Sequence, residues 1–157
     1  MKEKLLHALL VVAGAAVVLL LAAFLLLGGS YPSRALAEAN SVTFPPIEEF
    51  EHYTTVERGE ITEHMMTSRE ALAALKAGSP VPIGTHLVLV DYRNGQVFRY
   101  FVSQKVGEGA GDWEFQWFHP DRSVKADENT ARCYSCRRSR QDSQFMFTFS
   151  EAQDFGL

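Results

Sequence analysis

Residues 86–102 read HLVLVDYRNGQVFRYFV, two runs rich in β-branched and aromatic residues that meet at Asn94-Gly95. Residues of these types favour strands. Asn-Gly accepts the positive φ angles that a two-residue hairpin turn requires. The stretch therefore predicts an antiparallel hairpin, and this hairpin is the centre of the expected sheet.

The residues before the hairpin predict a helix and a further strand. Thr67-Ser68-Arg69-Glu70 has the form of a capping box, and strong helix formers fill residues 71–77. Gly78 is a typical helix stop, so a helix of about ten residues is expected. Further upstream, the pattern predicts a strand near 60–65 and a short helix near 47–53.

The residues after the hairpin predict two more strands, at 113–118 and at 145–149, from their alternating and aromatic character. Trp113, Phe115 and Trp117 share one face of the first of these strands, because strand side chains alternate. That face is either a hydrophobic layer covered by the helix or an aromatic wall for a flat apolar ligand. The expected fold class is α+β, mainly an antiparallel β-sheet with one or two packed helices.

The chain begins with a membrane-directed segment. Lys2 and Lys4 precede an uncharged apolar run at 8–27, which as a helix is long enough to cross a bilayer. The small residues of Ala35-Leu36-Ala37 also suit cleavage by signal peptidase. Residues 1–37 are thus expected to be an N-terminal membrane anchor or a signal peptide, with a linker at 38–46 and one domain at 47–157. With Lys2 and Lys4 on the cytoplasmic side of the membrane, the domain is expected in the periplasm, with or without an anchor in the inner membrane.

The charge of the exported part excludes one class of partner. After Ala37 there are 12 Lys and Arg against 18 Asp and Glu, a formal charge of −6. A general nucleic-acid surface would need to be basic, so no nucleic-acid partner is expected. The basic residues concentrate late, around the two cysteines. These basic residues are Arg132, Arg137, Arg138 and Arg140. They form either a solvated basic face, opposite in charge to an acidic one, or a patch that attracts anions.

The stretch Cys133-Tyr134-Ser135-Cys136-Arg137 differs by one residue from C-x-x-C-H, the attachment sequence of a c-type haem. Arg137 stands at the axial-ligand position, but a guanidinium has no lone pair to give to iron. Without haem, the two thiols would be a disulfide or a dithiol in an oxidising compartment, and nearby arginines would favour the thiolate. Structural zinc needs four ligands, and a thioredoxin-like C-x-x-C would follow an early strand, so both are disfavoured.

The order of these motifs resembles the cytochrome P-460 family, which includes cytochrome c′-beta. The similarity runs from about residue 60 to 149, and its pieces are Lys76-x-Gly78, Gly84-Thr85, the run 111–115 with Asp121, Cys133-x-x-Cys136, and the run 145–148. The resemblance implies a periplasmic, mostly β protein with one haem c attached through Cys133 and Cys136. Members of this family bind nitric oxide or, with a lysine cross-linked to haem, oxidise hydroxylamine.

Two residues of the chain depart from that family pattern. Arg137 replaces the axial histidine, and the strand 85–92 has no lysine for a cross-link, since Lys76 and Lys105 lie elsewhere. A different iron ligand would then come from a histidine elsewhere in the chain. His119 is the first candidate, and His52, His64 and His86 are the others.

Two functions follow as hypotheses. One is a cytochrome P-460-like haem protein with altered ligation that handles a nitrogen-oxide ligand or passes electrons to a redox partner; the resemblance does not supply hydroxylamine oxidation here. The other is a haem-free binding or redox-switch module that uses Cys133 and Cys136. Both allow attachment to a membrane through the N-terminal segment and assembly as a homodimer.

Overall fold

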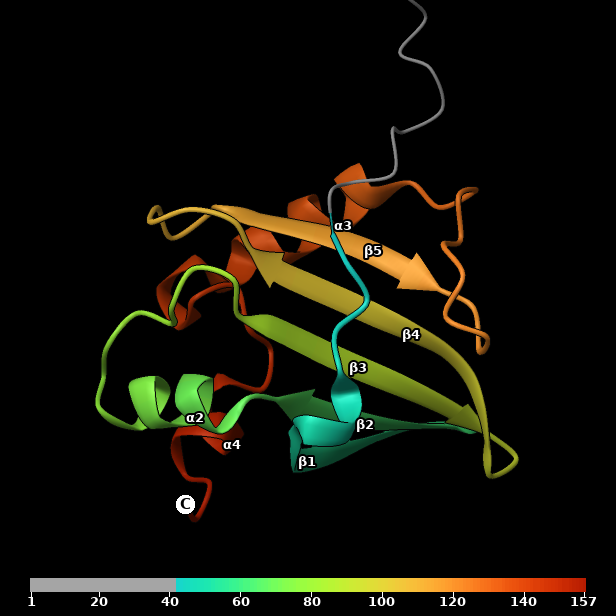
Figure 1. Cartoon of the computed structure of the whole chain (residues 1–157), viewed down its shortest axis with the longest axis horizontal. Helices are drawn as coiled ribbons and strands as arrows, with labels where there is room; N and C mark the ends of the chain where they lie inside the picture. The colour runs from blue at the N-terminus through green and yellow to red at the C-terminus, as the bar shows by residue number, and fades with distance from the viewer. Residues whose placement is uncertain (1–41) are drawn as a thin grey trace, which may run out of the picture. The chain divides into compact units, whose positions relative to one another are not determined.

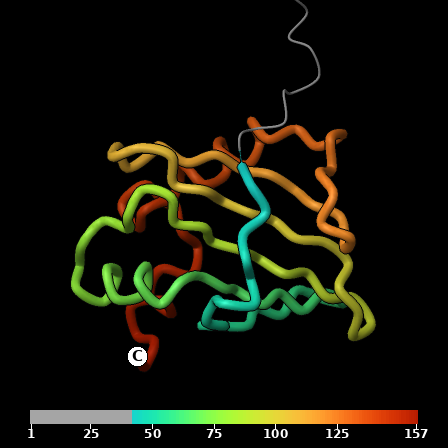
Figure 2. Tube along the Cα trace, viewed as in Figure 1, coloured from blue at the N-terminus to red at the C-terminus, as the bar shows by residue number. Residues whose placement is uncertain are grey.

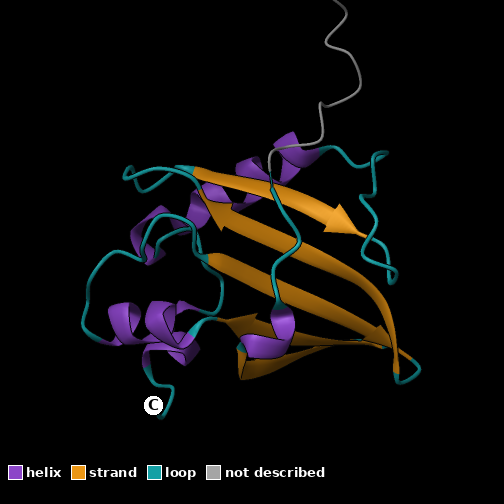
Figure 3. Cartoon of the chain, in the orientation of Figure 1, coloured by secondary structure: helices purple, strands orange, loops and turns teal. Residues whose placement is uncertain are grey.

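A five-stranded antiparallel sheet is the framework of the fold (Figures 1 and 3). The computed structural model describes residues 42–157. The strands lie in sequence order across the sheet, each paired with its neighbours in the chain. Their bounds are β1 Glu51–Arg58, β2 Ile61–Thr67, β3 His86–Arg93, β4 Gln96–Lys105 and β5 Trp113–Phe118.

Short helices complete the described part of the chain, which confirms the α+β class. They are the 3-10 helix η1 Ile47–Glu49, α2 Arg69–Lys76, α3 Thr130–Arg137, the 3-10 helix η2 Arg138–Ser143, and α4 Phe149–Gln153. Helix α2 contacts α4, and α3 contacts β5. Within residues 42–157, no helix has the length and apolar character needed to cross a bilayer.

The hairpin predicted at 86–102 is confirmed as β3 and β4. Arg93 pairs with Gln96 across the turn, and the two turn residues have positive φ angles, 51° for Asn94 and 74° for Gly95. Asparagine and glycine adopt these angles at low cost, whereas a β-branched residue would be strained there. The local sequence thus fixes where β3 ends and β4 begins.

Helix α2 begins one residue later than a capping box on Thr67 would place it. The N-cap is Ser68, whose hydroxyl oxygen accepts a hydrogen bond from the backbone N–H of Ala71 at 3.1 Å. The hydroxyl of Thr67 instead donates to the carbonyl oxygen of His86 at 2.7 Å, between β2 and β3. The helix is therefore joined to the sheet at its first turn, and two of its own residues, Leu72 and Leu75, are fully buried.

The sheet has a core on each face. Helices cover one face, called here the helix face, and its buried members include Met65, Leu72, Leu87, Phe101, Trp113, Phe115 and Phe145. On the other face, segment 42–50 crosses the strands (Figure 2). There Phe44 packs edge-on against the rings of Tyr100 and Phe118, with centroids 5.0 and 5.2 Å away. The two cores explain why the central strands carry apolar residues on both faces.

Two predicted elements differ from the structure. The helix expected at 47–53 is only the three-residue turn η1, because β1 already begins at Glu51. The prediction of a strand at 145–149 is wrong. Gln144 and Phe145 have positive φ angles of 51° and 63°, so the chain turns there, and α4 begins at Phe149. Burial of Phe145 and Met146 against the sheet, rather than strand pairing, accounts for their apolar character.

The membrane-directed segment predicted at 1–37 lies outside the described residues, as does the start of the linker at 38–46. From Val42 onward the chain lies against the sheet, and Val42 itself is buried.

Candidate functional site

Helix α3 carries both cysteines on one side. Its N-cap is Asn129, whose side-chain oxygen accepts a hydrogen bond from the backbone N–H of Ala131 at 3.1 Å. Cys133 and Cys136 are three residues apart, and residues at this spacing are neighbours on a helix surface. Cys133 is half-buried, Cys136 is exposed, and both are free thiols. The helix thus presents two thiols together.

A pocket of about 470 Å³ opens beside these two thiols. Its wall is formed by α3, by the loop before it, by Arg99 of β4 and by Trp117 near the end of β5. The lining residues are Arg99, Trp117, Glu128, Asn129, Arg132, Cys133, Ser135 and Cys136. Volumes of this size are typical of small-molecule sites, so the pocket is the candidate functional site.

The aromatic strand contributes one ring to the pocket. Trp113 and Phe115 are 5% and 3% exposed and belong to the core of the helix face. Trp117 is only partly buried and lines the pocket. Two rings of this strand face are therefore core, and the third lines the pocket.

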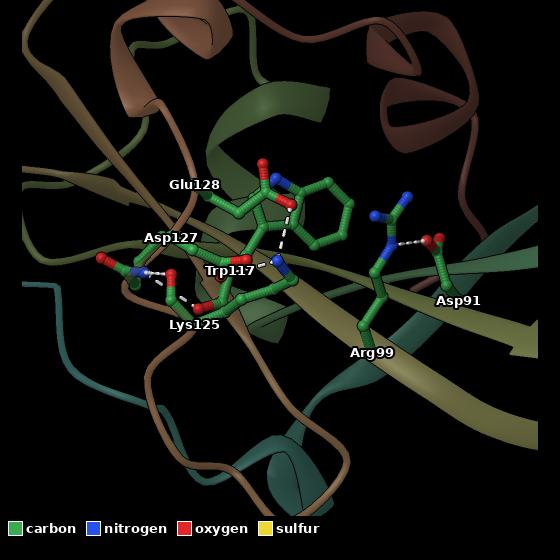
Figure 4. A network of polar contacts seen from close by, with 7 residues as sticks. Asp91, Arg99, Trp117, Lys125, Asp127 and Glu128 are labelled. Carbon is green, nitrogen blue, oxygen red and sulfur yellow. Dashed lines mark hydrogen bonds and ion pairs between the residues drawn. The ribbon is translucent and has the colours of Figure 1, made fainter.

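Arg99 is held in place above that third ring. Its Nε lies 2.6 Å from Oδ2 of Asp91, which is 1% exposed, and its guanidinium lies 3.8 Å from the centre of the Trp117 ring (Figure 4). A buried carboxylate and an aromatic face each stabilise a guanidinium. The pocket thus contains a cation with a fixed position.

The rim of the pocket carries a second group of charges. Lys125 lies 2.7 Å from Asp127 and 3.2 Å from Glu128, as Figure 4 shows. Arg132 also lines the pocket and forms no ion pair with any of residues 42–157. Lys125 is therefore shared between two carboxylates, one of which lines the pocket, while Arg132 has no carboxylate partner among the described residues.

Arg137 lies in the core and not in the pocket. It is 8% exposed, and its Nη1 donates a hydrogen bond to the carbonyl oxygen of Phe145 at 2.9 Å. The guanidinium lies 5.2 to 5.7 Å from the centres of the rings of Phe101, Phe115 and Phe147. Burial lowers its pKa from the usual value. Arg137 therefore connects the end of α3 to the turn at Phe145.

The arginines act on Cys133 in the expected direction, but burial outweighs them and the net shift of the pKa is upward. Burial raises the pKa of this thiol, and Glu128 acts in the same direction. Arg137 and Arg132 lower the pKa, but burial has the largest effect. At neutral pH Cys133 is thus a thiol rather than a reactive thiolate.

The four histidines considered as iron ligands all lie away from the pocket lining. His119 follows β5 and is exposed. His52 and His64 stack on one another on β1 and β2, with ring centroids 4.3 Å apart, and His86 begins β3. Within residues 42–157 there is also no group of three or more His, Cys, Asp or Glu that could hold a metal ion.

These positions test whether the residues fit a c-type haem. Two thiols and a flat tryptophan wall suit the attachment of a haem, but none of the described histidines reaches the pocket and Arg137 is bonded inside the core. The residues therefore do not fit an iron-ligated haem.

Neither lysine considered in the sequence reaches the pocket. Lys76 is exposed at the end of α2, with Nζ 3.4 Å from the carbonyl oxygen of Phe155. Lys105 is buried at the end of β4, where its ammonium donates to the carbonyl oxygen of Gly109 and lies 5.5 Å from the centre of the Trp113 ring. Each side chain thus contacts the backbone of another segment, Lys76 near the C-terminus and Lys105 in the loop before β5.

Sequence reasoning missed Arg99, Glu128 and the helix that carries the cysteines. The period of two along β4 puts Arg99 on the same face as Phe101, and Phe101 pairs with Trp117 of β5. That pattern was a signal for Arg99. Asn129 followed by Thr130 and Ala131 was a weaker signal for the start of a helix.

Comparisons with known proteins give no family for this chain: no protein-family model matches it, and neither does any curated protein.

Proposed function

We propose that this chain is an exported, cytochrome P-460-like protein whose haem site has degenerated into a haem-free binding site with two thiols. The observation that carries the proposal is the position of Arg137. In the pattern that the sequence resembles, the residue after the second cysteine ligates iron. Here that residue is buried, and its guanidinium donates to the carbonyl oxygen of Phe145.

The contacts of Arg137 argue against a simple rotation of this side chain toward a ligand. Moving it into the pocket would leave the carbonyl oxygen of Phe145 unpaired in the core, which costs about 1–3 kcal/mol. It would also remove the guanidinium from three aromatic rings. The residue therefore supports the fold, and a haem in the pocket would have no iron ligand from this position.

The pocket itself supports a role in binding. It joins a flat ring, Trp117, to a fixed cation, Arg99, and to two thiols on α3. Thiols three residues apart on a helix lie about as far apart as disulfide geometry requires. Cys133 and Cys136 can thus exist as a dithiol, or as a disulfide after exchange with a disulfide-bearing redox partner, which would take up both electrons and both protons.

The test is made on the full chain, expressed with cytochrome c maturation factors and purified in mild detergent. We expect no Soret absorption band, and an intact mass equal to that of the polypeptide without haem. A c-type cytochrome produced in the same cells shows that the factors are active. A wild-type chain with a Soret band and a covalent haem mass would overturn the proposal.

Arg137→His provides a matched variant, because it rebuilds C-x-x-C-H by a single substitution. Haem attachment to this variant alone would show that Arg137 is what keeps the wild-type chain free of haem.

A second candidate is a haem protein with altered ligation, and the observation in its favour is that Trp117 and both cysteines face the same pocket. Such a protein would bind a nitrogen-oxide ligand or pass electrons. Hydroxylamine oxidation is not part of either proposal, since neither Lys76 nor Lys105 lines the pocket. The same spectrum and mass separate the two candidates.

A further inference from the structure

We infer that Cys133 and Cys136 form a site for a single Cu(I) ion, held between the two thiolate sulfurs at the mouth of the α3 pocket. The inference rests on the proposed haem-free state, because a thioether to haem would consume both sulfurs. It assigns a ligand class to the pocket that neither the resemblance nor the disulfide chemistry supplies.

The number of ligands selects the metal. Both thiols are on one side of α3 and line one pocket. Residues 42–157 contain no group of three or more His, Cys, Asp or Glu that could complete a larger coordination shell. Structural zinc takes four protein ligands and calcium takes six or more oxygens. Cu(I) is soft, prefers sulfur, and is stable with two thiolates in a linear arrangement.

The charges around the thiols favour the complex that Cu(I) would form. Two thiols that release two protons and bind one Cu(I) give a complex with a charge of −1. Arg132 lines the same pocket, and the guanidinium of Arg137 interacts electrostatically with both cysteines from the core side. Opposite charges attract more strongly where water is partly excluded, so these cations stabilise an anionic bis-thiolate complex.

Glu128, the one acidic residue of the lining, opposes this arrangement, as it opposes the ionisation of Cys133. Glu128 lies 3.2 Å from the ammonium of Lys125, which also pairs with Asp127. Arg132 and Arg137, both on α3, outnumber this carboxylate, so the net field at the thiols is positive. A divalent ion would give a neutral complex with the same two thiolates and would gain less from them.

The experiment is an anaerobic titration of the reduced full chain with Cu(I), in competition with the chelator bathocuproine disulfonate. The haem-free mass is confirmed first on the same sample. We expect one Cu(I) per chain. The matched variant is the double substitution Cys133→Ser/Tyr134→Cys, which keeps two cysteines but spaces them two residues apart. Position 134 does not line the pocket, so the moved thiol no longer faces Cys136.

Loss of one of two linked ligands should weaken Cu(I) binding by roughly 10²- to 10⁴-fold in that variant. Gln141→Ala, which alters an exposed residue outside the pocket lining, should bind as wild type does. Circular dichroism checks that each variant is folded. The inference is overturned if the wild-type chain fails to compete for Cu(I), or if the transposed variant binds as tightly. A haem-bearing mass would instead overturn the proposed function, and this inference with it.

Discussion

Replacement of Arg137 tests whether this residue acts as a part of the core. The side chain is 8% exposed, donates to the carbonyl oxygen of Phe145, and has three aromatic rings around its guanidinium. Two substitutions separate its charge from its packing. Arg137→Met keeps the length of the side chain without its charge, whereas Arg137→Ala removes both.

The magnitudes follow from these contacts. A hydrogen bond from a charged group contributes about 1.5–3 kcal/mol, and each cation–π contact adds about 0.5–1 kcal/mol. Burial of a charge costs several kcal/mol, and no carboxylate pairs with Arg137 among residues 42–157. These effects nearly cancel, so Arg137→Met should change the free energy of unfolding by no more than about 1–2 kcal/mol. Arg137→Ala also leaves a cavity and should cost about 2–5 kcal/mol.

The assay is urea denaturation of the full chain, followed by the fluorescence of Trp113 and Trp117, which both lie on the helix face. Comparison of the two variants at constant m-value gives the difference in stability. A loss below about 0.5 kcal/mol for Arg137→Ala would be that of an ordinary surface substitution. That result would refute the burial of Arg137 and with it the structural argument against a ligand role.

The remaining predictions concern two buried acidic groups. Burial raises the pKa of Glu63, with Asp91 adding to the shift and Arg58 opposing it. A raised pKa means that the native state loses stability as the pH rises above the ordinary pKa of a glutamate. Glu63→Gln should therefore increase the free energy of unfolding, measured by urea denaturation, more at pH 7 than at pH 4. An equal effect at both pH values would contradict this. Burial also raises the pKa of Tyr53 to about 12, and its hydroxyl bonds to that of Thr148 at 2.7 Å. Wild-type stability should therefore fall between pH 10 and 12, whereas Tyr53→Phe should lose about 1 kcal/mol at pH 7 and show a flatter alkaline profile; identical profiles would exclude this role.

The parts of the fold that local sequence determines were predictable. Asn94-Gly95 sets the β3–β4 turn through its backbone preference, and Ser68 starts α2 through its own side chain. The predicted strand at 113–118 coincides with β5. In each case the residues that decide the structure lie within the element or next to it.

The parts that depend on distant contacts were not predictable. Phe145 has the composition of a strand residue, yet it adopts a positive φ angle where its carbonyl oxygen meets Arg137. The sequence excluded Arg137 as an iron ligand but gave no sign that it enters the core. The pocket was likewise hidden, because it joins Arg99 of β4 to α3, which follows β5 by a long loop.

The strand order also bears on how the chain is made. Each strand pairs with its neighbour in sequence, so the sheet can assemble from short-range contacts while synthesis continues. Its helix face, in contrast, is closed by the last residues: Thr148 bonds to Tyr53, and the side chain of Gln153 donates to the carbonyl oxygen of Leu75. Until residues 130–157 have emerged, a wide apolar face remains open to other chains, and a product that ends early would be prone to aggregate.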